Sequence, residues 1–117
     1  MSQSPYVMDV TTQDFVAAVV EKSREIPVLV DFWADWCPPC ISLEPVLKQV
    51  VEEASGKVRL AKVEVDEGDN MKLAGQYQLR GFPTVILFVD GRECGRFSGF
   101  KPVEAIRDFL ADAGGIL

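Results

Sequence analysis

The chain has 117 residues, with 12 basic and 18 acidic side chains, a net charge of −6 and no histidine. The length suits one domain, and an apolar fraction of 48% can form a core, so we expect residues 1–117 to fold as a single domain. An acidic chain without a basic run is a poor candidate for binding nucleic acid or an anionic membrane. The lack of histidine excludes Ser-His-Asp and Cys-His catalysis and every metal site that requires histidine.

The first half of the chain predicts two strands and two helices. We expect a strand at Tyr6–Val10 and then a helix capped by Thr11 or Thr12. Apolar residues share one face of that helix: Phe15, Val16, Val19 and Val20. The run Val28–Trp33 is typical of a strand buried on both faces, and a helix should extend from the Cys37–Cys40 segment to about Ser55, kinked at Pro45.

The second half predicts three strands and two helices. The expected ranges are a strand at Val58–Val65, a helix at Asn70–Tyr77, strands at Thr84–Val89 and Arg92–Phe97 joined by the turn Asp90-Gly91, and a helix from Pro102. The order β-α-β-α-β-α-β-β-α predicts an α/β fold, with a mixed five-stranded sheet and four helices on its two faces.

Two of the three cysteines, Cys37 and Cys40, lie where a buried strand meets a helix. At positions i and i+3 of a helical turn the Cα atoms are about 5 Å apart, close enough for a disulfide. A cysteine at the helix N-cap faces unpaired N–H groups that favour its thiolate, and the second cysteine lies one turn deeper and is better shielded. We therefore expect Cys37 to be an exposed, acidic thiol and Cys40 its buried partner. This arrangement suits thiol–disulfide exchange. The alternatives are half a zinc site or two inert cysteines, and four ligands for zinc are not available here.

The segment Val28–Cys40, with its sequence Trp36-Cys37-Pro38-Pro39-Cys40, resembles the active-site segment of thioredoxins, and Arg80–Thr84 resembles their substrate-facing loop. Pro45, Lys62, the Asp90-Gly91 turn and Gly99 also match, so the similarity extends from about Tyr6 to Leu110. The resemblance implies the thioredoxin fold and the activity of a dithiol–disulfide oxidoreductase.

The resemblance also implies roles for four residues. Cys37 would be the attacking nucleophile, Cys40 the resolving thiol, and Asp31 the carboxylate that transfers a proton, with Lys62 as its neighbour. Considered alone, Asp31 could be a buried proton shuttle or a carboxylate at a strand end that reaches water. Lys62 could equally be a lysine whose ammonium extends to solvent.

Further residues are implied at the substrate surface. By resemblance Pro83 is cis and leaves the backbone of Phe82 free to pair with an extended substrate chain. An apolar rim around Cys37 would consist of Trp36, Phe82, Gly99 and Phe100. Cys94 matches no residue of the mechanism, and we expect it to be a small apolar filler.

The sequence departs from the family near the cysteines. Pro38 stands where thioredoxins usually have glycine, Ile41 where they have a basic residue, and Glu44 adds acidity where the family is often neutral. These changes bear on the reduction potential and on recognition by a generic thioredoxin reductase.

The leading hypothesis is a monomeric enzyme that reduces disulfides of protein substrates and is itself reduced by a thioredoxin reductase. No bound cofactor is expected, since no glycine-rich dinucleotide fingerprint is present. An odd, low cysteine count and no visible signal peptide or membrane span predict a cytoplasmic setting. One alternative is a co-chaperone or peptide-binding module of thioredoxin type, whose redox activity is secondary. Another is an oxidase or isomerase of an oxidising compartment.

Overall fold

A computed structural model describes residues 4–116 of the chain. The elements in chain order are β1 (Val7–Asp9), the π-helix η1 (Val16–Glu21), the 3-10 helix η2 (Lys22–Arg24), β2 (Val28–Trp33), α1 (Pro38–Glu53), β3 (Arg59–Glu64), α2 (Met71–Gln76), β4 (Thr84–Val89), β5 (Arg92–Ser98) and α3 (Val103–Gly114). The predicted strands and helices are therefore present, with ends that differ by a few residues.

The five strands form one mixed sheet in the order β1-β3-β2-β4-β5. β1, β3 and β2 are parallel, whereas β4 and β5 are antiparallel to their neighbours. The prediction of a mixed five-stranded sheet in an α/β fold is confirmed. β2 occupies the centre, and its residues from Val28 to Phe32 are buried, as its almost continuous apolar sequence predicts.

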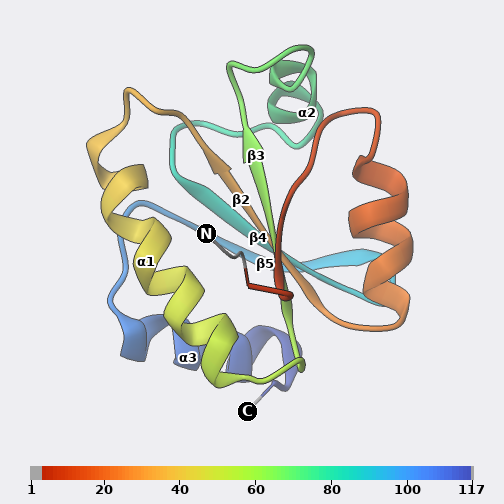
Figure 1. The fold of residues 1–117 in the computed structure, drawn as a ribbon, viewed down its shortest axis with the longest axis vertical. Helices are drawn as coiled ribbons and strands as arrows, with labels where there is room; N and C mark the ends of the chain where they lie inside the picture. The colour runs from red at the N-terminus through yellow and green to blue at the C-terminus, as the bar shows by residue number, and fades with distance from the viewer. Residues whose placement is uncertain (1–3, 117) are drawn as a thin grey trace.

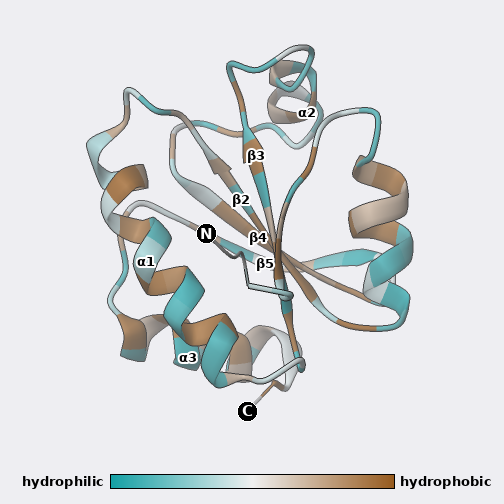
Figure 2. Cartoon of the chain, in the orientation of Figure 1, coloured by the Kyte–Doolittle hydropathy of each residue, from teal (hydrophilic) through white to brown (hydrophobic). Residues whose placement is uncertain are grey.

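Apolar side chains fill both sides of the sheet, because successive residues of a strand point to opposite faces. On one face Leu29 of β2 belongs to a buried cluster with residues of α1 and α3, and on the other face Val30 packs with Phe15 and Val19 of the η1 region. Figure 1 shows α1 and α3 together on one side of the sheet and the η1 segment on the other. In Figure 2 apolar and polar stretches alternate along α1 and α3, as helices with one buried side require.

The first helix differs from its predicted pattern. Phe15 and Val19 are buried as expected, but Val16 is 59% exposed. The segment winds as a π-helix, whose wider turn moves Val16 off the face that an ordinary α-helical period assigns to it. Thr11 does not cap the helix, because its hydroxyl donates to the Asp14 carboxylate, 3.1 Å away.

β5 accounts for a second wrong prediction. Cys94 is exposed rather than a buried filler. β5 lies at the edge of the sheet, most of its residues are exposed, and its pairing with β4 shifts register between Leu87 and Phe88. The turn before it is as predicted: Asp90 and Gly91 both have positive φ, 55° and 83°. At Gly91 a Cβ atom would lie 2.8 Å from the Arg24 guanidinium.

Asn70 joins three loops near the end of β3. Its side-chain oxygen accepts a hydrogen bond from the backbone N–H of Thr12 at 2.9 Å, and its amide donates to the carbonyl oxygen of Glu64 at 2.9 Å. Asn70 is buried and is the partner of the Thr12 N–H, whereas the Glu64 carbonyl oxygen also accepts from the backbone N–H of Glu67 at 3.1 Å.

We expect Asn70→Ala to lower the free energy of unfolding by about 1–3 kcal/mol, because it leaves the Thr12 N–H without its partner and removes one of the two hydrogen bonds to the Glu64 carbonyl oxygen. Urea denaturation measures the loss. The control Glu67→Ala, at an exposed position of the same loop, should change stability by less than about 0.5 kcal/mol. Equal effects of the two substitutions would contradict the proposed bridging role.

Candidate active site

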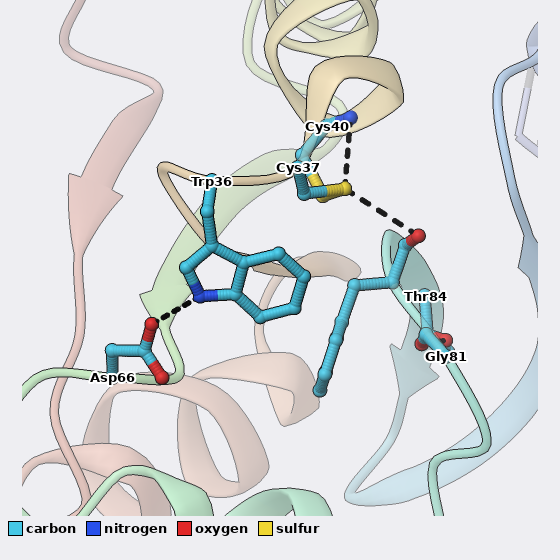
Figure 3. The surroundings of a disulfide bond; sticks show 7 residues. Trp36, Cys37, Cys40, Asp66, Gly81 and Thr84 are labelled. Carbon is cyan, nitrogen blue, oxygen red and sulfur yellow. Dashed lines mark hydrogen bonds between the residues drawn. A yellow bond between two sulfur atoms is a disulfide. The ribbon is translucent and has the colours of Figure 1, made fainter.

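Cys37 and Cys40 form a disulfide at the N-terminus of α1, with their Cα atoms 5.3 Å apart (Figure 3). Cys37 is the N-cap residue, and its sulfur accepts a hydrogen bond from the backbone N–H of Cys40 at 3.3 Å. Pro38 and Pro39 occupy the first two helical positions, where a backbone N–H has no partner within the helix. The sequence motif therefore forms a helix start at which the Cys40 N–H donates to the Cys37 sulfur.

Both cysteines are largely buried, which corrects the expectation that Cys37 is exposed. Cys37 is 4% exposed and Cys40 is 1% exposed. The loop before β4 approaches Cys37, whose sulfur lies 3.5 Å from the carbonyl oxygen of Phe82. The Phe82–Pro83 peptide bond is cis, as the resemblance implied. Only a small part of Cys37 therefore faces solvent.

Trp36 forms one wall beside the disulfide. Its side chain is 59% exposed, contacts the ring of Phe82 edge to face at 6.1 Å between centroids, and donates its indole N–H to the Asp66 carboxylate. Figure 3 shows the indole between Asp66 and the disulfide region. Asp66 was not foreseen, because no sequence spacing links the loop after β3 to Trp36.

A shallow hollow lies beside Trp36 at the start of α1. Its volume is about 440 Å³, and its lining consists of Asp35, Trp36, Pro38, Ile41 and Ser42. The side chain of Ile41 and that of Phe100 are both about half exposed. Gly99 follows β5 with a φ of 84° and donates its N–H to the carbonyl oxygen of Pro83 at 2.9 Å. Gly99 is thereby tied to the cis-proline loop that faces Cys37.

Asp31 is buried in β2, six residues before Cys37, and is only 1% exposed. Its Oδ1 accepts no hydrogen bond from the described residues 4–116. Burial raises the pKa of this carboxyl from 3.8 to about 7, while the Lys62 charge acts in the opposite direction and the Glu44 charge adds to the rise. Asp31 can therefore exchange a proton near neutral pH.

Lys62 is the register partner of Asp31 in the adjacent strand β3. Its ammonium, however, forms an ion pair with the Glu44 carboxylate of α1 and lies 4.9 Å from the centre of the Trp33 ring. The predicted neighbourhood of Lys62 and Asp31 is present in the backbone, but no ion pair joins the two within the part of the chain that the structure describes.

The described part of the chain, residues 4–116, offers neither a metal centre nor a membrane-spanning helix. Among residues 4–116, no group of three or more Cys, Asp or Glu side chains is arranged to hold a metal ion. No helix in the described range is both long and apolar enough to cross a membrane.

A CxxC disulfide at a helix N-terminus, facing a cis-proline loop and preceded by a strand that carries a buried carboxyl, defines the site of a dithiol–disulfide oxidoreductase. The Thioredoxin family model matches residues 6–112. Similar proteins include thioredoxins of Mycolicibacterium smegmatis (39% identical, covering 97% of this chain and 99% of the relative) and Alicyclobacillus acidocaldarius subsp. acidocaldarius (40%, covering 90% and 95%). The thioredoxin of Bacillus subtilis is 36% identical, covering 89% and 94%.

The chain belongs to the thioredoxin family. It is an enzyme of the dithiol–disulfide oxidoreductase type, with Cys37 and Cys40 as its redox-active pair. The alternative of a co-chaperone or peptide-binding module is not favoured, because the similar proteins described above are thioredoxins matched over nearly their full length.

The raised pKa of Asp31 predicts how stability depends on pH. In the folded oxidised protein the Asp31 carboxyl keeps its proton up to about pH 7, whereas in the unfolded chain it keeps it only to about pH 4. The free energy of unfolding therefore falls as pH rises between these values. We expect Asp31→Asn to remove a loss of about 2–4 kcal/mol over this range and to make the protein more stable than wild type at pH 8.

Urea denaturation from pH 4 to pH 8 measures this dependence. Asp108→Asn, at an exposed position of α3, serves as the control and should retain the wild-type profile. If Asp31→Asn also retained that profile, or was less stable at pH 8, Asp31 would be a structural ion rather than a titrating group.

Pro38 generates a separate prediction. The N–H that faces the Cys37 sulfur belongs to Cys40, so Pro38→Gly leaves this hydrogen bond in place. We expect the variant to stay active, with a Cys37 pKa changed by less than about one unit and a reduction potential changed by less than about 30 mV. Thiolate absorbance and a glutathione equilibrium measure the two quantities, and a larger change in either would show that Pro38 controls the redox function.

Proposed function

We propose that the protein reduces disulfides of protein substrates, with Cys37 as the nucleophile and Cys40 as the resolving thiol. The observation that supports this most strongly is the Cys40 N–H that donates to the Cys37 sulfur at the start of α1. The hydrogen bond and the positive end of the helix dipole both stabilise a thiolate on Cys37. Cys40 is the more buried of the two, so a substrate meets Cys37 first.

The reaction proceeds in two exchanges. The Cys37 thiolate attacks one substrate sulfur, the substrate disulfide breaks, and a mixed disulfide forms while one substrate thiolate leaves and takes up a proton. Cys40 then loses its proton and attacks the Cys37 sulfur, which releases the second substrate thiolate. The substrate gains two electrons and two protons, and the protein is left with the Cys37–Cys40 disulfide.

Asp31 is proposed to accept the proton of Cys40 during the second exchange. Two observations support this role. Asp31 lies in β2, which leads into the Cys37 turn, and two residues beyond Leu29, on the sheet face that α1 covers. Its pKa is about 7, which suits proton transfer near neutral pH. Lys62, on the same face of β3, is proposed to adjust the charge around Asp31.

The substrate is proposed to bind as an extended segment along the loop before Pro83. The backbone groups of Phe82 make no backbone hydrogen bond among the described residues, so they are available to an incoming chain. Trp36 and Gly99 would contact the side chains that flank the substrate disulfide. The protein would act as a monomer, since all of these residues belong to one chain.

We further propose that residues 1–117 form one thioredoxin domain and that a thioredoxin reductase returns it to the dithiol. The working compartment would be reducing, such as the cytoplasm. An exposed unpaired thiol at Cys94 supports this choice, since oxidising compartments favour paired cysteines.

The test uses reduction of a model protein disulfide by dithiothreitol. Cys37→Ser should abolish catalysis, because no nucleophile remains, whereas Cys40→Ser should accumulate the mixed disulfide, visible by mass spectrometry. Cys94→Ser is the control and should retain more than about half of the turnover, since its sulfur lies outside the pair. Undiminished turnover in both active-site variants would refute the mechanism.

A further inference from the structure

Glu44 links two lysines on the side of α1 that faces β3. Its carboxylate pairs with Lys48 one turn along the helix at 3.1 Å and with Lys62 of β3. The side chain of Lys62 is only 11% exposed, so its ammonium has few alternative partners in solvent. Glu44 is therefore the anion that determines where the Lys62 charge lies.

Asp31 is the other anion within reach of Lys62. The two residues are aligned in the parallel pairing of β2 and β3, and neighbouring strands are about 4.8 Å apart. Leu29 and Leu60, two residues earlier in each strand, belong to the same buried cluster, so Asp31 and Lys62 lie on the same face of the sheet. A lysine at this position could turn its ammonium to Asp31 if Glu44 did not hold it.

We propose that Glu44 is a positioning residue, which holds the Lys62 ammonium against α1 and so leaves the buried Asp31 carboxyl without a cationic partner. The inference rests on the proposed function in one respect, the role of Asp31 as proton acceptor. It assigns to Glu44, through Lys62, the control of whether that carboxyl is protonated at neutral pH.

The other charged groups on this side of the sheet do not replace Glu44. β1 contributes Asp9, whose backbone pairs in register with Lys62, and β3 contributes Glu64. On α1 the nearest further charge is Lys48, which Glu44 also binds, and Cys37 and Cys40 titrate only as the dithiol. β4 faces Asp31 with Val85 and Leu87 and adds no charge, and Arg107 of α3 is paired with Glu53.

Both effects of Glu44 on Asp31 have the same sign. Its own negative charge raises the pKa of Asp31, and Lys62 lowers it. Replacing Glu44 by a neutral residue removes the first effect and releases Lys62 to strengthen the second. The pKa of Asp31 must then fall, and the carboxylate must be more populated at pH 6–7 than in the wild type.

The experiment follows the Asp31 carboxyl carbon by NMR titration of the full-length oxidised protein. In Glu44→Gln we expect the pKa of Asp31 to fall by roughly one unit. Glu53→Gln is the matched control: it removes the same charge from the same helix, breaks the ion pair with Arg107, and should shift Asp31 by less than about 0.2 units. An unchanged Asp31 titration in Glu44→Gln overturns the inference.

A double variant tests whether Glu44 acts through Lys62. In a Lys62→Met background, Glu44→Gln should move the Asp31 titration by less than about half as much, because no ammonium is left to redirect. A shift of the same size in both backgrounds would show that Glu44 acts only by its own charge and would overturn the positioning role. Glu44→Asp keeps the charge and should restore most of the wild-type value.

Kinetics separate this inference from the proposed function. The rate at which Cys40 resolves the mixed disulfide should fall at acidic pH, as Asp31 becomes protonated. In Glu44→Gln this fall should move to lower pH by the same interval as the NMR titration. Asp31→Asn should slow the resolution step and remove its dependence on pH in the acidic range. If the NMR shift occurs while Asp31→Asn resolves at the wild-type rate, the positioning role stands and the proton-transfer role of Asp31 fails. Glu44→Ala serves if Glu44→Gln does not fold.

Discussion

The burial of β2 at the centre of the sheet is the constraint on which the rest of the site depends. Because β3 and β4 flank this strand and helices cover both of its faces, its end is fixed in space. The chain leaves β2 at Trp33 and enters α1 at Pro38, so Cys37 is held between the C-terminal end of the strand and the N-terminus of the helix. The position of the two cysteines thus depends on the packing of β2, although neither cysteine belongs to that strand.

The same burial imposes an electrostatic cost on Asp31. A carboxylate in this position has lost its water without gaining an ion pair among the described residues, and its pKa rises accordingly. An apolar residue at this position would cost less free energy on folding. The raised pKa, however, suits Asp31 to the proton transfer proposed for it near neutral pH. The Lys62 charge offsets part of this cost, but the Lys62 ammonium is paired with Glu44 and not with Asp31.

Around the disulfide, the apolar surface and the polar contacts have separate tasks. Trp36 and Ile41 present exposed apolar area beside a sulfur that is itself nearly covered. The hydrogen bond from Trp36 to Asp66 fixes the indole without involving the cysteines. Exposed apolar surface therefore lies beside a largely buried cysteine, which suits the substrate binding proposed above.

Sequence alone determined the parts of this protein that depend on neighbours in the chain. The apolar run Val28–Trp33 predicted the central strand, Asp90-Gly91 predicted the hairpin, and the spacing of Cys37 and Cys40 predicted a disulfide at a helix start, because each follows from backbone geometry over a few residues. The resemblance to thioredoxins added the cis bond at Pro83, which local sequence does not specify.

Only the tertiary structure decided the remaining features, because they depend on segments far apart in the sequence. Val16 fits the apolar face of an ordinary helix and Cys94 was expected to be a small apolar filler, yet both are exposed, since one lies in a π-helical turn and the other in an edge strand. Lys62 has two possible anionic partners, Asp31 and Glu44, which are 31 and 18 residues away in the chain. The packing of α1 against β3 brings Glu44 to Lys62, and no periodicity of the sequence predicts this pairing.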